Sequence, residues 1–255
     1  MIKRLLKLIV FSLFIISGAF LWIGRKPSSA NLKWGELDSQ GPLFNSRAGV
    51  LIIFNSGGWG NTAFEEAEDF GKVIRGIRAI LNKLRWETAI ISYGRTADNF
   101  WGRLRGLKEI FTSFRSQSKK LANQINIFLN NNPKVRVLMA GLSLGADFTG
   151  ETAKKIGKTD RVAAIKAGTP FWADSQKSEN ILELANEKDL LVTGDYKTLV
   201  SLALRGAIRW VTAKIKQRKL FFSEAMHFPG HRYDWRSTWF RKQINSFLEN
   251  NFKIM

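Results

Sequence analysis

Short apolar runs alternate along most of the chain with segments whose apolar residues have helical spacing. Five runs have the length of a buried strand, at residues 50–54, 88–93, 135–140, 161–167 and 180–185. Helical segments are expected at 64–84, from the turn at 141–147 to 156, at 196–219 and at 237–250, and a segment rich in Phe, Arg and Lys at 99–120 is followed by a helix to about 130. Continuous apolar strands separated by helices are typical of parallel sheets, because the crossover helices bury both faces. The alternation therefore predicts an α/β fold over residues 31–255, with a mostly parallel central sheet flanked by helices.

One predicted strand-to-helix turn carries a motif with a chemical meaning. The strand at 135–140 runs into Gly141-Leu142-Ser143-Leu144-Gly145, which matches G-x-S-x-G, a pattern expected about 0.1 times by chance in a chain of this length. A sharp turn at this place lifts the serine hydroxyl out of the sheet edge, and the two glycines let neighbouring backbone come close. Ser143 is therefore the predicted nucleophile. The alternative is a glycine-rich turn with an exposed serine.

A serine nucleophile needs a general base, and the chain has two histidines. His231 follows Gly230 in a polar loop before the last predicted helix, so it can reach back over the sheet edge. His227 lies between a methionine and a phenylalanine and has the surroundings of a packed neighbour. We expect His231 to be the base, with His227 as the alternative, unless both are loop residues.

The base in turn needs a carboxylate that holds its tautomer. Asp189 directly follows the strand at 180–185, and it lies between Ser143 and His231 in the chain. It is the predicted acid of the triad, with Asp195 and Glu187 as alternatives. Each of these carboxylates can instead belong to a turn or cap a helix.

The negative charge that develops on an attacked carbonyl needs hydrogen-bond donors. The amide of Leu144 opens the helix after the serine. The turn at 56–60, Ser-Gly-Gly-Trp-Gly, can direct the amide of Gly58 or Trp59 to the same point. We predict an oxyanion hole from these groups, the alternative being an ordinary β-to-α turn.

These motifs together resemble the α/β-hydrolase superfamily, in which a serine after the fifth strand, an acid after the seventh and a histidine after the eighth form the triad. The resemblance covers about residues 49–252. The segment 168–172, Gly-Thr-Pro-Phe-Trp, is similar to one that follows the sixth strand of lipase-like members, and 231–235 is similar to their histidine loop. The turn at 54–60 is similar to their oxyanion turn, with Ser56 where histidine often stands.

The resemblance implies hydrolysis of an ester, thioester or amide through an acyl-enzyme, with no metal or organic cofactor. The expected substrate is a lipid or another carboxylic ester. Two alternatives remain: an acyltransferase that uses the same triad, and a non-catalytic binding or envelope protein on the same scaffold. The motif at 141–147 and the turn at 56–59 are also similar to bacterial virulence proteins of the VirJ type, which are associated with type IV secretion.

The first thirty residues differ from the rest of the chain. Three basic residues precede an uncharged run over 8–24, and Arg25 and Lys26 follow it. The stretch 5–24 is long enough to cross a bilayer as a helix. We expect residues 1–30 to be a membrane anchor that leaves the domain on the extracytoplasmic side. A signal peptide cleaved near Ser28-Ser29-Ala30 is the alternative, and it would give a secreted protein.

The amino-acid composition excludes some kinds of catalytic chemistry and indicates an anionic binding partner. Without cysteine the chain has no thiol catalysis and no disulfide, and two histidines make a histidine-rich metal centre improbable. The net charge is +19, and basic residues alternate with aromatic and aliphatic ones over 99–120 and 196–222. Such segments are typical of interfacial helices, so we expect contact with an anionic membrane surface, the alternative being solvated charge over packed apolar faces. No nucleic-acid-binding module is recognisable, and the sequence predicts no oligomeric state.

Overall fold

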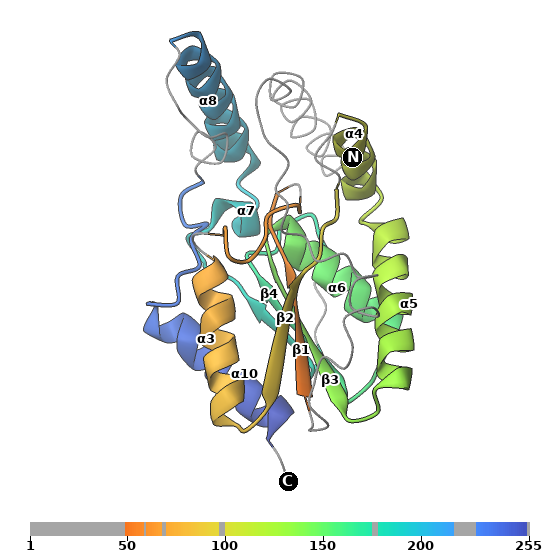
Figure 1. The fold of residues 1–255 in the computed structure, drawn as a ribbon. Helices are drawn as coiled ribbons and strands as arrows, with labels where there is room; N and C mark the ends of the chain where they lie inside the picture. The colour runs from red at the N-terminus through yellow and green to blue at the C-terminus, as the bar shows by residue number, and fades with distance from the viewer. Residues whose placement is uncertain are drawn as a thin grey trace.

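A five-stranded parallel sheet forms the centre of the molecule (Figure 1). The computed structural model describes residues 49–58, 60–67, 70–96, 100–174, 178–216 and 228–253. The strands are β1 (Gly49–Asn55), β2 (Glu87–Ser92), β3 (Val135–Leu142), β4 (Val162–Ala167) and β5 (Ile181–Leu184). Their order is β2-β1-β3-β4-β5, and every neighbouring pair is parallel. The predicted α/β fold with a parallel sheet is therefore confirmed.

Helices cover both faces of this sheet. They are α3 (Phe70–Lys83), α4 (Phe100–Phe111), α5 (Arg115–Asn131), α6 (Leu144–Ile156), α7 (Leu190–Thr193), α8 (Tyr196–Ile215) and α10 (Thr238–Phe252). Helices α3 and α10 pack on one face and α5 and α6 on the other (Figure 1). Because side chains alternate along a strand, Ile52 and Phe54 of β1 face α3 and α10, while Leu51 and Ile53 face α5 and α6.

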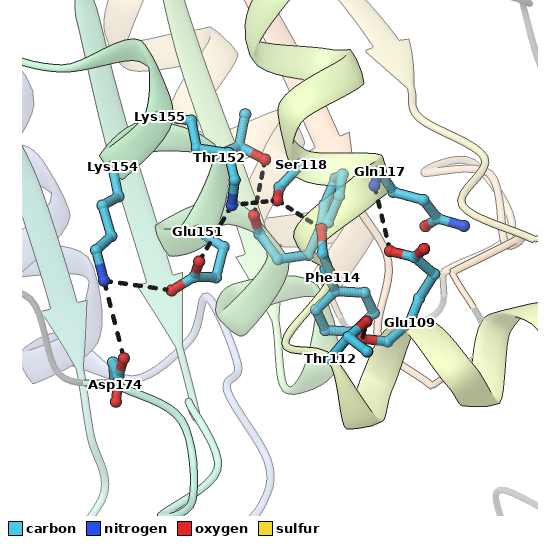
Figure 2. Close-up of polar contacts among 11 residues, drawn as sticks. Glu109, Thr112, Phe114, Gln117, Ser118, Glu151, Thr152, Lys154, Lys155 and Asp174 are labelled. Carbon is cyan, nitrogen blue, oxygen red and sulfur yellow. Dashed lines mark hydrogen bonds and ion pairs between the residues drawn. The ribbon is translucent and has the colours of Figure 1, made fainter.

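The predicted boundary at about residue 120, between the basic segment at 99–120 and the helix after it, lies earlier in the structure, between α4 and α5. Ser113 and Phe114 both have positive φ, a conformation that ends a right-handed helix. The Phe114 side chain is buried edge-on against Phe148 of α6, which explains why the chain turns here. A carboxylate oxygen of Glu109 in α4 accepts a hydrogen bond from the backbone N–H of Gln117 in the first turn of α5 (Figure 2).

Polar contacts also join α5 to α6. The Lys155 ammonium of α6 donates to the Ser118 hydroxyl of α5 at 2.7 Å and lies 3.2 Å from the Glu151 carboxylate (Figure 2). Ser118 is fully buried, and its hydroxyl donates to the carbonyl of Phe114. These bonds hold α5 against the helix that begins at the predicted nucleophile.

The carboxyl ends of the five strands share one edge of the sheet, which we call the carboxyl edge. The strand order reverses between β1 and β3, and ligands of open α/β sheets bind at such a point. The predicted nucleophile follows β3, and the predicted oxyanion turn follows β1. Both motifs therefore lie at the position where this topology favours a site.

The expected membrane segment at 1–30 lies outside the described residues. Within the part of the chain that the structure describes, no helix combines the length and the apolar character that a bilayer crossing requires.

Candidate active site

Ser143 lies in a sharp turn between β3 and α6. Its backbone has φ 56° and ψ −122°, outside the regions that non-glycine residues favour. Its N–H donates to the Ala167 carbonyl at the end of β4, at 2.9 Å. Ala146 and Asp147 donate their amides to the Ser143 carbonyl, which starts the helix. The turn is therefore held from both sides, and the Ser143 residue remains partly exposed.

Both glycines of the G-x-S-x-G motif are required by close backbone contacts. A Cβ on Gly141 would lie 2.3 Å from the carbonyl oxygen of Gly145. A Cβ on Gly145 would lie 2.1 Å from the carbonyl oxygen of Asn55 and 2.6 Å from that of Ser56. Even one methyl group would therefore push α6 away from the end of β1. This agrees with the reason given for the motif from sequence, that the glycines permit close approach.

Asp189 is fully buried after β5, and three donors satisfy its carboxylate. Its Oδ1 accepts from the N–H of Leu191 at 2.9 Å, which also caps α7. Its Oδ2 lies 2.7 Å from Nδ1 of His231 and accepts from the hydroxyl of Tyr233 at 2.9 Å. Burial raises the pKa of Tyr233, so the hydroxyl stays protonated and acts as a donor. The structure thus brings together the predicted acid and the predicted base.

The imidazole of His231 lies beside the end of β4. A Cβ on Gly168 would be 2.9 Å from Cε1 of His231 and 2.6 Å from Cε2 of Tyr233, so these rings cover that glycine. Gly168 directly follows Ala167, whose carbonyl binds the amide of Ser143. Ser143 and His231 therefore flank the same short segment. With Nδ1 donating to a carboxylate, the imidazole has the tautomer that leaves Nε2 as an acceptor.

The alternative acids have other surroundings. Glu187 is exposed in the turn after β5. Asp195 is exposed and accepts hydrogen bonds from the hydroxyl and the amide of Thr198 at the start of α8. The Thr198 hydroxyl bond lowers the pKa of Asp195, as is usual for a helix-capping carboxylate. The alternative base, His227, lies outside the described residues.

The turn after β1 comes close to the serine at Gly57, a residue that was not among the predicted site residues. A Cβ on Gly57 would lie 3.6 Å from Cβ of Ser143. The Gly57 carbonyl accepts from the amide of Gly60 at 3.1 Å, and Gly58 has φ +54°. The Gly58 amide belongs to the peptide group that follows Gly57, so it lies near the serine. Trp59 is outside the described residues, and Leu144 begins α6, where backbone N–H groups have no partner within the helix.

Arg95 is a further residue of this site that the sequence analysis did not identify. Its guanidinium is buried and donates to the carbonyl of Ser56 at 2.6 Å, of Gly58 at 3.2 Å and of Leu144 at 3.4 Å. It therefore connects the turn after β1 to the first residue of α6. A Cβ on Gly60 would lie 2.2 Å from Nε of Arg95, so the turn needs a glycine where the guanidinium passes.

Aromatic rings and a carboxylate surround this buried guanidinium. Its Cζ lies 5.0 Å from the ring centroid of Phe114 and 5.6 Å from that of Phe148, distances typical of cation–π contacts. Burial lowers the pKa of Arg95 to about 10, while the nearby negative charge of Asp147 opposes this shift. The guanidinium is therefore charged at neutral pH, and its hydrogen bonds to the carbonyls are charge-assisted.

Within the described residues, no group of three or more His, Cys, Asp or Glu side chains is arranged to hold a metal ion. The site consists instead of a serine at a strained turn, a histidine–carboxylate pair and two backbone segments that carry amides.

Comparison with known proteins adds only distant likeness to solved structures. No family model matches the chain, and the search of curated proteins finds no match either. The matching solved structures include a cutinase from Trichoderma reesei in complex with a C11Y4 phosphonate inhibitor. It aligns over 64% of this chain and 75% of that chain, with 15% identity and a TM-score of 0.39. This likeness is too weak to assign a family or an activity, so the functional conclusion depends on the site's own geometry.

Proposed function

We propose that this protein is a serine hydrolase of the α/β-hydrolase type, which cleaves carboxylic esters through an acyl-enzyme on Ser143. The single observation that supports it best is the buried Asp189 carboxylate bonded to Nδ1 of His231, beside the segment that binds the Ser143 amide. A buried carboxylate on one imidazole nitrogen, with the other left for proton transfer, is the arrangement that a serine nucleophile needs.

In the proposed reaction, Nε2 of His231 takes the proton of the Ser143 hydroxyl while the oxygen attacks the ester carbonyl. The imidazolium then gives this proton to the leaving alcohol, and the acyl group stays on the serine. Water then attacks the acyl carbon while Nε2 takes one of its protons. The bond between the acyl carbon and Oγ of Ser143 breaks, the imidazolium returns the proton to Oγ, and the carboxylic acid leaves. Asp189 stabilises the imidazolium, and Tyr233 helps to position Asp189.

The amides of Leu144 and Gly58 are the proposed oxyanion donors, and Trp59 is the alternative to Gly58. Gly57 supports this proposal because a Cβ on it would lie 3.6 Å from Cβ of Ser143, and the Gly58 amide directly follows it in the chain. Arg95 is proposed as a positioning residue, since it binds the carbonyls of both donor residues. Donors fixed in advance need no rearrangement when charge develops, and this is the largest single contribution in many acyl-transfer enzymes.

The remaining parts of the proposal concern substrate and location. We propose a lipid or lipid-like ester as substrate, and attachment to a membrane through residues 1–30 with the domain on the extracytoplasmic side. The apolar run over 8–24 and the basic residues before it support the attachment.

The proposed function is tested with the purified full chain on p-nitrophenyl esters of two to twelve acyl carbons. We expect hydrolysis, and a loss of roughly 10⁵-fold or more in Ser143→Ala, since removing the nucleophile of a triad has an effect of this size. Ser237→Ala removes a hydroxyl from an exposed residue and is the matched control. Hydrolysis that survives in Ser143→Ala, or no hydrolysis of any ester, would contradict the proposal.

A further inference from the structure

Helix α8 extends from the carboxyl edge of the sheet, at the same end of the molecule as the candidate site (Figure 1). Its buried side includes Leu199 and Ala213. Its opposite side carries Leu204, Ile208 and Ile215, which are 53%, 59% and 77% exposed. These three account for most of the large exposed hydrophobic residues in the described part of the chain. A cluster of this kind on one helix indicates a binding surface rather than scattered exposure.

The exposed side of α8 has two parallel stripes. Leu204, Ile208 and Ile215 are separated by four and then seven residues, close to one and two helical turns, so they lie in one line. The next residue after each is basic and exposed, and these residues are Arg205, Arg209 and Lys216. A shift of one residue turns the position by about 100° around the axis. An apolar stripe is therefore accompanied along its whole length by a positive one.

The positive charge of this surface indicates that its partner is anionic. The segment 196–216 contains no Asp or Glu, and the whole chain carries a net charge of +19. An apolar stripe beside a stripe of Lys and Arg matches the boundary of an anionic bilayer, with acyl chains below and phosphate groups at the level of the cations. Helix α4 is at the same end in Figure 1, and its Arg105 and Lys108 are exposed as well.

We propose that α8 docks on an anionic phospholipid surface, with Leu204, Ile208 and Ile215 in the acyl boundary and Arg205, Arg209 and Lys216 on lipid phosphates. Docking turns the carboxyl edge toward the bilayer, where a lipid ester would enter the site. This last statement rests on the proposed ester hydrolysis, whereas docking itself does not.

The chain lacks cysteine, so one introduced thiol gives a unique label. An environment-sensitive fluorophore is attached to the full chain that carries Ile208→Cys. Quenching of its fluorescence by brominated lipid is measured with vesicles of phosphatidylglycerol and phosphatidylcholine, and with vesicles of phosphatidylcholine alone. The control is Ile127→Cys, at a position on α5 that is 61% exposed. Both single-cysteine variants contain residues 1–30, so attachment through this segment affects the two labels alike. We expect quenching at position 208 that needs anionic lipid, and little quenching at position 127.

Charge variants test the basic stripe. Replacing Arg205, Arg209 and Lys216 by Gln should shift the docking equilibrium on anionic vesicles on the order of 100-fold, since each cation contributes a factor of about five. The control has the same change of charge on exposed residues in or just before α10: Arg236→Gln, Arg241→Gln and Lys242→Gln.

Three results would overturn the docking proposal. The first is no quenching of the label at position 208 with either vesicle composition. The second is equal quenching at positions 208 and 127. The third is an equal shift of the docking equilibrium in the two triple variants. Hydrolysis of a short soluble ester should be the same in the α8 triple variant and the unmodified chain. If neither hydrolyses it while position 208 is still quenched, the ester-hydrolase proposal fails and the docking proposal stands.

Discussion

Replacing Arg95 by Met would remove the guanidinium that connects the turn after β1 to α6. Methionine is unbranched and flexible, so its thioether can lie against Phe114 and Phe148, where the guanidinium lies in the unmodified chain. The substitution therefore removes hydrogen bonds with little loss of packing. If Arg95 positions the oxyanion donors, both stability and turnover should fall.

The size of each effect follows from the hydrogen bonds. The bonds to Ser56 at 2.6 Å and Gly58 at 3.2 Å are within the usual range, and the one to Leu144 at 3.4 Å is at its limit. Two bonds from a charged donor contribute about 3–6 kcal/mol, and relief of the buried charge offsets part of their loss. We expect the free energy of unfolding to fall by about 2–4 kcal/mol. We expect kcat to fall about 100-fold with KM nearly unchanged, as when one oxyanion donor is misplaced.

Arg161→Met is the matched control. Nη1 of Arg161 also lies within hydrogen-bond distance of three carbonyls, those of Leu129, Asn132 and Pro133, but near the opposite edge of the sheet. Arg161 is partly exposed, so water can replace these bonds. Urea unfolding followed by tryptophan fluorescence gives the stability, and steady-state hydrolysis of a soluble ester gives kcat and KM. If Arg95→Met has the kcat of Arg161→Met, Arg95 is a structural residue only and the positioning argument is wrong.

Three further substitutions give contrasting outcomes. Gly145→Ala places a methyl group against the end of β1 and should abolish ester hydrolysis and lower the melting temperature. Gly150→Ala, in the same helix, is the control. Its methyl group would meet only the end of a lysine side chain, so ester hydrolysis and the melting temperature should change little. Tyr233→Phe keeps the ring but removes one donor from the carboxylate of Asp189, so kcat should fall about tenfold with a nearly unchanged circular dichroism spectrum. Burial raises the pKa of Tyr93 to about 12 from 10.0, so its contribution to stability is complete below pH 10 and lost as the pH rises toward 12. Urea titrations should therefore show a smaller loss of stability over that pH interval in Tyr93→Phe than in the unmodified chain, and equal losses would exclude this role for Tyr93.

The sheet could be predicted because its central strands β1, β3 and β4 are buried on both faces. The continuous apolar run at 50–54 and the mostly apolar run at 135–140 are typical of buried strands, and the ends of the observed strands differ from the predicted ones by at most two residues. The sequence placed the break in 99–130 at about residue 120, whereas the structure has it between Phe111 and Arg115, because the apolar spacing continues through that point. The chain turns at Ser113 and Phe114 because the Phe114 ring packs on α6, a tertiary contact that local spacing does not encode.

The residues of the candidate site also form two groups, those that could be proposed from the sequence and those that could not. Ser143, Asp189 and His231 could be proposed from the sequence because each follows a strand or precedes a helix in a pattern with a chemical reason. Arg95 and Tyr233 bind their partners across 39 and 44 residues of sequence, and nothing local distinguishes them from other buried or loop residues. Gly230, directly before His231, is the one local feature of the sequence that points to this contact. A Cβ on Gly230 would lie 2.0 Å from the carbonyl oxygen of Lys188, so the glycine allows the histidine loop to pack against Asp189.

The most direct test of the central claim is the mass of the protein after treatment with a fluorophosphonate, followed by peptide mapping. The account predicts one adduct per chain, on Ser143, that forms at neutral pH. It also predicts a rate that falls at least about 100-fold in His231→Ala, because the hydroxyl then has no base. No adduct, an adduct on another residue, or labelling of Ser143 at an unchanged rate in His231→Ala would contradict it.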